Sequence, residues 1–455
     1  MEAVYLKKTF SVALPVILTQ LTTTITGFIG MAFLATLGHT VLAASALLYS
    51  IQTMILVIGA SPLFSLSILV SRAFGGSEKH EIGIILKQSW ILTLLIVLII
   101  FVLYSSISFI LHAFGQLPQL VAIIKPYFNI ARWGVPAALM NISCSQFLLG
   151  IGKQKLVAML SVLRTLFLIV TGYIFVLGHF GVMHYGVAGW GVAFTITAWL
   201  MLFIILSIFY WQHDFKKFQI FSMDMRGGLR HLNNLFKFGW PIMFQTGSEL
   251  FSFGFVTLMV GWLGAVALAS MQVVTQFLMI MVIPAYGFSM SASVLVGYSL
   301  GAKNYTQARI FGYINFILCT LLITFFAIVI NVFPTQLAHI FLQPAEPNYQ
   351  QILALVKTIF TIVAFSQIFD SIRNSLTGAL RGLLDMRFPM IVSFIAIWVL
   401  RVPISYYLAF KLHMGVIGIA YGAVIGMFVG SIIIFWRWYQ KTKNIHLIHI
   451  PASKQ

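Results

Sequence analysis

Acidic side chains are scarce in this sequence, with 9 Asp and Glu against 27 Lys and Arg among 455 residues. Charged residues make up 8% of the chain and hydrophobic residues 60%, which excludes an ordinary water-soluble domain. So few acids also supply no carboxylate cluster at which a membrane-embedded enzyme could bind a metal or catalyse a reaction. We therefore expect a membrane protein that is not an enzyme.

Cysteine is equally rare, and phosphate-binding motifs are absent. Cys144 and Cys319 lie in separate apolar runs without CxxC or metal-ligand spacing, so both are expected to be small buried side chains. No G-x-x-x-x-G-K-S/T motif is present, which excludes ATP hydrolysis at a P-loop of this chain. The net charge of +18 is not gathered into a basic patch with stacking aromatics, so we expect no nucleic-acid partner.

Long apolar runs, in contrast, are abundant. Each of twelve runs has about 20 to 30 residues, enough to cross the hydrocarbon core of a bilayer as a helix. We therefore predict an all-α integral membrane protein with twelve transmembrane helices. The predicted spans are residues 9–37, 44–72, 86–113, 122–149, 156–179, 186–211, 235–262, 267–300, 309–341, 350–379, 388–411 and 415–439.

Basic residues mark every second break between the predicted spans, from Lys7 near the start to Lys443 near the end. Lysine and arginine gather on the cytoplasmic side of membrane proteins, so both termini are expected in the cytoplasm. Lys411 is the exception to this pattern. The short loops and termini indicate a bacterial protein, and we expect it in the cytoplasmic membrane.

The chain divides into two similar halves at its longest polar break. One constant offset of 226 residues relates matching positions, which indicates an internal repeat. Six spans per half is an even number, so the halves run parallel, as in one class of secondary transporters. We predict an amino-terminal lobe at 1–212, a cytoplasmic linker at 213–234 and a carboxy-terminal lobe at 235–455. The matched pairs include Pro15 with Pro241, Gly38 with Gly264, Ser65 with Ser291 and Gly75 with Gly301.

Four glycines recur at four-residue spacing in the last predicted span: Gly418, Gly422, Gly426 and Gly430. Such spacing allows helices to pack closely. We expect this packing inside one lobe rather than at a dimer interface, and hence a monomer.

Two acids, Glu249 and Asp370, lie inside predicted spans. A charge at the bilayer centre costs roughly 2.5 to 3.5 kcal/mol on insertion scales, so both are functional candidates. Two carboxylates in one low-dielectric cavity cannot both stay ionised cheaply, and a proton or a sodium ion would relieve the strain. In the alternative, Asp370 pairs with Arg373 three residues on, which leaves Glu249 to bind the cation. Three other intramembrane cations are expected to reach towards an interface: Arg132, Arg164 and Arg401.

A series of motifs along the chain carries a family resemblance. They are LPVILTQ at 14–20, LVSRAFGGSEKHE at 69–81 with its repeat LVGYSLGAKNYTQA at 295–308, WPIMFQTGSELF at 240–251, QIFD at 367–370 and LRGLLDM at 380–386. In order and spacing they resemble the multidrug and toxic compound extrusion (MATE) family, in its NorM-like branch. The resemblance covers nearly the whole chain.

This resemblance implies a cation-coupled antiporter, driven by H+ or Na+ and without other cofactors. Such a protein would export organic, cationic or amphipathic compounds by alternating access, with two six-helix lobes in a V-shaped arrangement. Small organic molecules and the lipid bilayer would be its partners. The alternative is a flippase for lipid-linked oligosaccharides or other amphiphiles, from the same wider superfamily.

Individual positions can be carried over from the family. Glu249 and Asp370 match the acids of its carboxy-terminal cation site. Its amino-terminal acids have no counterpart here, because Gly30 stands where many bacterial members have an aspartate, and Leu168 and Gly172 replace an asparagine and aspartate pair. Coupling is therefore expected in the carboxy-terminal lobe alone. Further matches are Gln272, Ser50 and Ala46 for the substrate cleft and Pro15 for a hinge.

Overall fold

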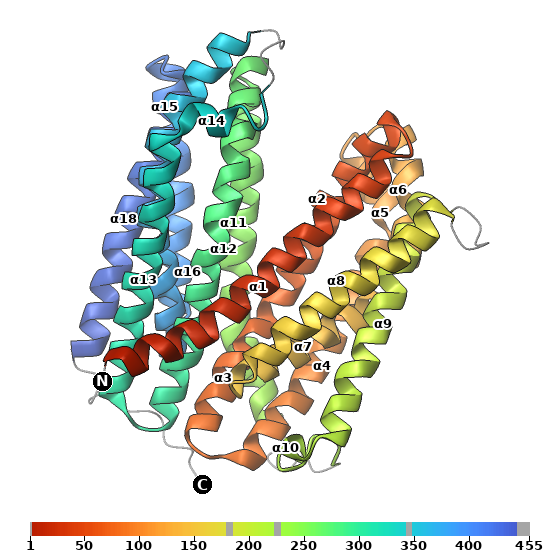
Figure 1. Ribbon diagram of the computed structural model, residues 1–455, viewed down its shortest axis with the longest axis vertical. Coiled ribbons are helices and arrows are strands. Elements are labelled where there is room, and N and C mark those ends of the chain that lie inside the picture. Colours follow the sequence, from red (N-terminus) through yellow and green to blue (C-terminus); the bar gives the residue numbers. More distant parts are fainter. Residues whose placement is uncertain (1, 179–184, 223–228, 343–347, 444–455) are drawn as a thin grey trace. The chain divides into compact units, whose positions relative to one another are not determined.

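The computed structural model describes residues 2–178, 185–222, 229–342 and 348–443. All regular structure in these residues is helical, which confirms the predicted all-α fold (Figure 1). Ten helical stretches of this described part are long and apolar enough to cross a membrane, and Val135–Gly150 is a shorter apolar helix. The chain is therefore a multi-pass membrane protein.

The twelve predicted spans all correspond to helices, although two of them fall outside those ten stretches. The run at 122–149 is divided between α6 (Pro118–Ala131) and α7 (Val135–Gly150). The run at 235–262 is α11 (Arg230–Gly261), which carries Gln245 and Glu249 near its centre. Polar residues inside α11 lower its hydropathy, so composition alone does not mark it as a membrane span.

The chain forms two compact units, one of Met1–Ile17 with Phe244–Gln455 and one of Leu18–Met243. The helices α1 (Glu2–Ala35) and α11 each continue from one unit into the other. We call these units the carboxy-terminal unit and the amino-terminal unit. The predicted lobe boundaries differ from them at residues 1–17 and 213–243 and remain a prediction, and the glycine pair of the predicted linker, at 227–228, lies outside the described residues.

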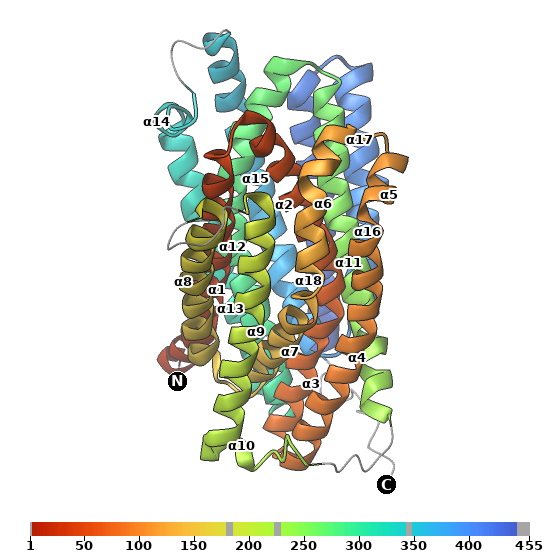
Figure 2. The same ribbon diagram turned by 90° about the vertical axis from the view of Figure 1, so that its right-hand side faces the viewer.

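The amino-terminal unit packs its helices around an aromatic core. Tyr104, Tyr127 and Phe128 are fully buried, and the ring of Phe128 meets the other two edge to face at centroid distances of 4.9 and 5.3 Å. Figure 2 shows α4, α7 and α9 side by side in this unit. Its helices besides α1 and α11 are α2 (His39–Ala60), η1 (Ser61–Leu63), α3 (Phe64–Gly75), α4 (Lys79–Ser105), α5 (Ile107–Ala113), α6, α7, α8 (Gln154–Leu177), α9 (Val187–Trp211) and α10 (His213–Lys216).

The carboxy-terminal unit is built on α12, α13, α15 and α18, which pack on one another. One of its spans is irregular, because the π-helical segments η2 and η3 interrupt it on both sides of α17. Short π-helical segments are frequent at functional sites. The helices are α12 (Ala265–Gly301), α13 (Tyr305–Val332), α14 (Pro334–Ala338), α15 (Tyr349–Gly382), α16 (Arg387–Phe394), η2 (Ile395–Arg401), α17 (Val402–Tyr406), η3 (Tyr407–Lys411) and α18 (Gly415–Lys443).

The four-residue glycine spacing of α18 serves packing inside this unit, as the sequence predicts. A Cβ atom on Gly418 would lie 2.7 Å from the backbone nitrogen of Ala409, and one on Gly422 would lie 2.6 Å from that of Ser405. Real side chains do not approach backbone atoms so closely. The glycines therefore let the irregular span from Arg387 to Lys411 lie directly against α18.

Substitution of Gly422 by alanine tests this packing. The added methyl group would meet the backbone of Ser405, which cannot move away cheaply, so we expect Gly422→Ala to destabilise the protein by about 1 to 3 kcal/mol. Gly254→Ala is the matched control, because a Cβ at this helical position has no neighbour within 4 Å. Thermal melting of both purified variants checks the prediction, and equal melting temperatures would contradict it.

Candidate functional site

The two acids inside predicted spans meet at one arginine. Arg373 Nη2 donates to Asp370 Oδ1 at 2.8 Å, and Nη1 donates to Glu249 Oε1 at 2.9 Å. The structure thus brings α11 and α15 together at the two acids that the sequence singles out. It also shows the Asp370–Arg373 pair, which the sequence leaves open as an alternative.

Burial differs strongly among the three charged side chains. Arg373 is 3% exposed and Asp370 14%, whereas Glu249 is 33% exposed. A buried charge is stable only when it is paired and hydrogen-bonded. Arg373 and Asp370 therefore form the buried part of the site, and Glu249 is its most exposed side chain.

Polar side chains hold these charges in place. Gln245 Nε2 donates to Glu249 Oε1 at 3.2 Å and to Ser393 Oγ at 3.0 Å, while its Oε1 accepts from Arg381 Nη2 at 2.9 Å. Asn374 Nδ2 donates to Asp370 Oδ2 at 2.9 Å. Both oxygens of Asp370 thus accept hydrogen bonds, which holds this carboxylate in one orientation.

Local helix geometry explains part of this arrangement. Gln245 precedes Glu249 by four residues, and Asn374 follows Asp370 by four, so each amide shares a helix face with its acid. Sequence reasoning missed both amides, although the spacing could have indicated them. Ser393 comes from another helix, α16, and its spacing gives no comparable signal. A Cβ on Gly430 would lie 3.0 Å from Ala396 Cβ and at ordinary contact distance, 3.4 Å, from Arg373 Cδ.

The predicted cleft and hinge residues come from three helices, α1, α2 and α12. Gln272 is exposed on α12 of the carboxy-terminal unit, and Ala46 and Ser50 are exposed on α2 of the amino-terminal unit. Ser50 Oγ donates to the Ala46 carbonyl at 2.9 Å. Pro15 lies inside the continuous helix α1. Their assignment to a substrate cleft and to a hinge stays a prediction.

The positions that lack amino-terminal acids are covered by one indole ring. A Cβ on Gly30 would collide with the ring of Trp190, and one on Gly172 would lie 2.7 Å from Trp190 Cζ3. Leu168 is buried in the same core, and Phe33 meets Trp190 edge to face. Where the family has ionisable groups, this chain therefore has aromatic packing.

Neutral hydroxyl pairs join α1 to α8 beside this ring. Thr22 Oγ1 lies 3.1 Å from Ser161 Oγ, and Thr26 Oγ1 lies 2.9 Å from Thr165 Oγ1. These hydroxyl contacts carry no net charge, and a third link between the two helices is the hydrogen bond that Arg164 Nη2 donates to Thr23 Oγ1 at 3.1 Å.

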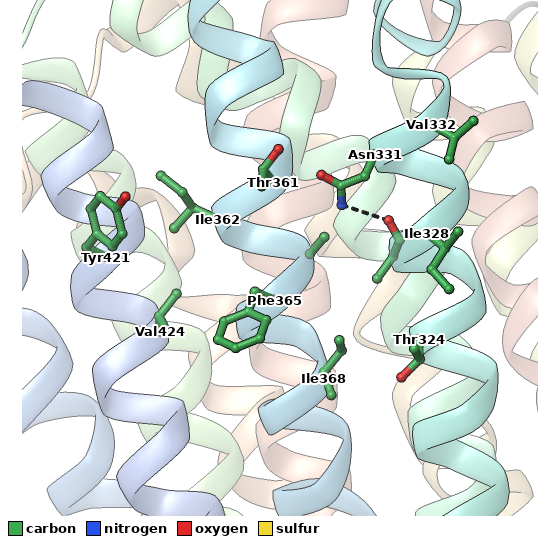
Figure 3. A pocket seen from close by; sticks show the side chains of 12 residues that line it. Thr324, Ile328, Asn331, Val332, Thr361, Ile362, Phe365, Ile368, Tyr421 and Val424 are labelled. Carbon is green, nitrogen blue, oxygen red and sulfur yellow. Dashed lines mark hydrogen bonds between the residues drawn. The ribbon is translucent and has the colours of Figure 1, made fainter.

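An apolar groove of about 620 Å³ opens elsewhere in the carboxy-terminal unit, between α13, α15 and α18 (Figure 3). Phe365 and Ile368 line it from a face of α15 different from that of Asp370. The Asn331 amide is turned to the backbone, because its Nδ2 donates to the Ala327 carbonyl at 2.8 Å. The groove therefore suits an alkyl chain, and none of its lining residues belongs to the ionic site.

Comparisons with known proteins give a consistent result. The MatE family model matches residues 15–174 and 241–407. A probable multidrug resistance protein NorM of Synechocystis sp. is 25% identical over 94% of this chain and 92% of that protein. The multidrug resistance protein NorM of Burkholderia vietnamiensis is 27% identical over 96% of this chain and 94% of that protein.

Solved structures share the fold. The Vibrio cholerae MATE transporter VcmN in the bent form matches with a TM-score of 0.86 at 20% identity, over 98% of both chains. The eukaryotic MATE transporter AtDTX14 matches with a TM-score of 0.84 at 19% identity, over 97% of this chain and 98% of that one.

Removal of Arg373 tests whether it holds the two acids together. Arg373→Met leaves two carboxylates without their cation, and breaking a buried ion pair in this way costs about 3 to 5 kcal/mol. The triple variant with Glu249→Gln and Asp370→Asn removes all three charges and should recover most of the lost stability. Thermal melting measures both variants. A triple variant no more stable than Arg373→Met would contradict the pairing.

Introduction of an acid at Gly30 tests the aromatic packing. Gly30→Asp should destabilise the protein by about 1 to 3 kcal/mol, because Trp190 already fills that space. Combination with Trp190→Ala removes the collision, so the double variant should be more stable than the sum of the two single changes predicts. Melting temperatures of the three variants give this coupling. If the stability changes of the two single variants add up to that of the double variant, direct contact between position 30 and Trp190 is contradicted.

Proposed function

This chain belongs to the MatE family, and on that premise we propose that it is a cation-coupled antiporter that exports organic compounds. The relatives named as multidrug resistance proteins support export of several compounds rather than one. The observation that carries the proposal is the pair of intramembrane acids on one buried arginine. Substrates are small organic molecules, and the coupling ion is H+ or Na+.

Glu249 is the exchangeable member of the site in this proposal. Its Oε1 accepts hydrogen bonds from Arg373 and Gln245, whereas its Oε2 accepts none from another residue of the described chain. A proton or a sodium ion can therefore bind at Oε2 while the hydrogen bonds to Oε1 persist. The partial exposure of Glu249 gives such a cation access.

Asp370 has a different task, because both of its oxygens accept hydrogen bonds, one from Arg373 and the other from Asn374. It anchors the guanidinium of Arg373, and Arg373 in turn orients Glu249. Binding of a cation at Glu249 weakens its attraction to Arg373, and a cationic group of a substrate competes with the coupling ion for the same carboxylate. This competition couples the inward movement of the ion to the outward movement of the substrate.

The remaining elements of the proposal follow from the family. Two lobes alternate between inward-open and outward-open forms, Pro15 allows α1 to bend, and Gln272, Ser50 and Ala46 contact the substrate. The protein works as a monomer in the bacterial cytoplasmic membrane with both termini in the cytoplasm. Coupling belongs to the carboxy-terminal lobe in this proposal, because the amino-terminal lobe has Gly30, Leu168 and Gly172 at the positions of the family's polar groups.

Flux through proteoliposomes tests the assignment of Glu249. Under an imposed proton or sodium gradient, Glu249→Gln should reduce export to the rate without a gradient, because the exchangeable carboxylate is gone. Asp370→Asn should also lower export, together with stability by about 3 to 5 kcal/mol, since Arg373 loses its anchor.

Asp214→Asn is the matched control for this experiment. Lys153 Nζ donates to Asp214 Oδ2 at 2.7 Å, and this hydrogen bond and the ammonium charge lower the pKa of the exposed carboxyl. Its loss removes one acid outside the membrane and should leave gradient-driven export unchanged, because exposed ion pairs contribute little. Undiminished export by both Glu249→Gln and Asp370→Asn would overturn the site.

A further inference from the structure

Arg401 stands at the end of the π-helical segment η2, inside the span Arg387–Lys411. Its Nε is buried without a hydrogen-bond partner. Its guanidinium forms no hydrogen bond or ion pair with another residue in the described part of the chain, and it interacts electrostatically with Asp370, Arg373 and Glu249. An unpaired guanidinium inside a membrane span is costly and calls for a function.

The surroundings hold Arg401 close to the ionic site. Ser393 bonds to Arg373, and Trp398 Nε1 donates to Ser248 Oγ at 2.8 Å, so the α16–η2 segment faces α11 and α15 up to the turn before Arg401. A Cβ on Gly426 would lie 2.7 Å from Arg401 Cβ, which means that α18 presents no side chain there. Arg401 thus lies at the end of the π-helical segment η2 and faces Gly426, which leaves space for its side chain.

Two structural explanations of Arg401 do not account for these features. The first is that the side chain of Arg401 extends to the membrane–water interface, as the sequence predicts. Ten residues separate Arg401 from the end of the span at Lys411, about 15 Å along a helix, which is farther than an arginine side chain extends. Pairing with Asp370 is the other, but Arg373 and Asn374 already occupy both oxygens of that carboxylate.

Charge balance points to an anion. The hydrogen-bonded groups of the site include two guanidiniums, Arg373 and Arg381, and two carboxylates, Glu249 and Asp370, so their charges balance. The guanidinium of Arg401, which interacts electrostatically with these charges, adds one positive charge that no carboxylate of the site matches. A guanidinium fork matches a carboxylate with two parallel hydrogen bonds. The unpaired guanidinium of Arg401 and the one unmatched positive charge therefore both suit a single carboxylate as ligand.

We propose that Arg401 binds a carboxylate of the transported compound, so that zwitterionic organic compounds are preferred over purely cationic ones. The cationic group of such a compound lies at Glu249 and its carboxylate at Arg401. The proposal rests on the export function above, and it adds the class of substrate.

A pair of dyes tests this preference. One is a rhodamine with a free benzoate carboxylate, which is a zwitterion, and the other is its methyl ester, a cation with the same ring system. Fluorescence polarisation with the purified full-length protein in detergent measures binding of each dye without any gradient. The parent protein should bind the acid more tightly than the ester.

Variants of Arg401 assign the preference to this residue. Arg401→Gln should weaken binding of the acid by at least about tenfold, equivalent to about 1.4 kcal/mol, and leave the ester within about twofold. Arg401→Lys keeps the charge but loses the fork, so it should bind the acid with intermediate affinity. Arg132→Gln is the matched control, because Arg132 is an arginine of the amino-terminal unit that bonds to Ser105. It should change neither affinity.

Stability separates this role from a structural one. Removal of an unpaired buried charge should leave the melting temperature of Arg401→Gln equal to that of the parent or higher, whereas a structural arginine would lower it on removal. Tighter binding of the ester by the parent, equal weakening of both dyes by Arg401→Gln, or failure of the parent to bind the acid would overturn the proposal.

The test also distinguishes the two proposals. If gradient-driven flux is absent but the dye preference is intact, the antiport mechanism is contradicted and the role of Arg401 is supported. If flux is intact but the protein shows no dye preference, the role of Arg401 is contradicted and the antiport mechanism is supported.

Discussion

The guanidinium of Arg373, almost completely buried between two carboxylates, is the interaction on which the site depends. Such a charge has to be matched by partners at short distance, and this requirement fixes where α11 and α15 lie relative to each other. It also explains why Ser393 stands where it does, since its hydroxyl accepts a hydrogen bond from the guanidinium. Most of the polar residues around the site serve this one ion-pair network.

The two halves of the chain are similar in sequence pattern and different in chemistry. Glu249 corresponds to Thr23 at the repeat offset, and Thr23 accepts a hydrogen bond from Arg164 rather than pairing with it as an ion. Trp190 covers Gly30 and Gly172, so the interior of the amino-terminal unit is aromatic there. The paired carboxylates inside the predicted spans thus lie in one half, whereas the corresponding interior of the other half is aromatic and hydroxyl-lined.

Much of the fold could be predicted from the sequence, because long apolar runs, glycines and polar breaks are local signals. The meeting of Glu249 with Asp370 was also within reach, since intramembrane acids are rare, and the three-residue spacing indicated the Asp370–Arg373 pair. Other features depend on contacts between distant segments. The hydrogen bond that Arg373 donates to Ser393 and the burial of Arg401 Nε arise from the way α16 and η2 pack, and no spacing in the sequence encodes them.

The account places the exchange of cations at Glu249, next to an arginine that stays in place. Infrared difference spectroscopy of the purified protein observes this exchange directly, because a carboxylate that gains a proton or a metal ion changes its stretching frequency. When the coupling cation is added, we expect a carboxylate band that disappears in Glu249→Gln and persists in Asp214→Asn. The same band in Glu249→Gln would contradict the account.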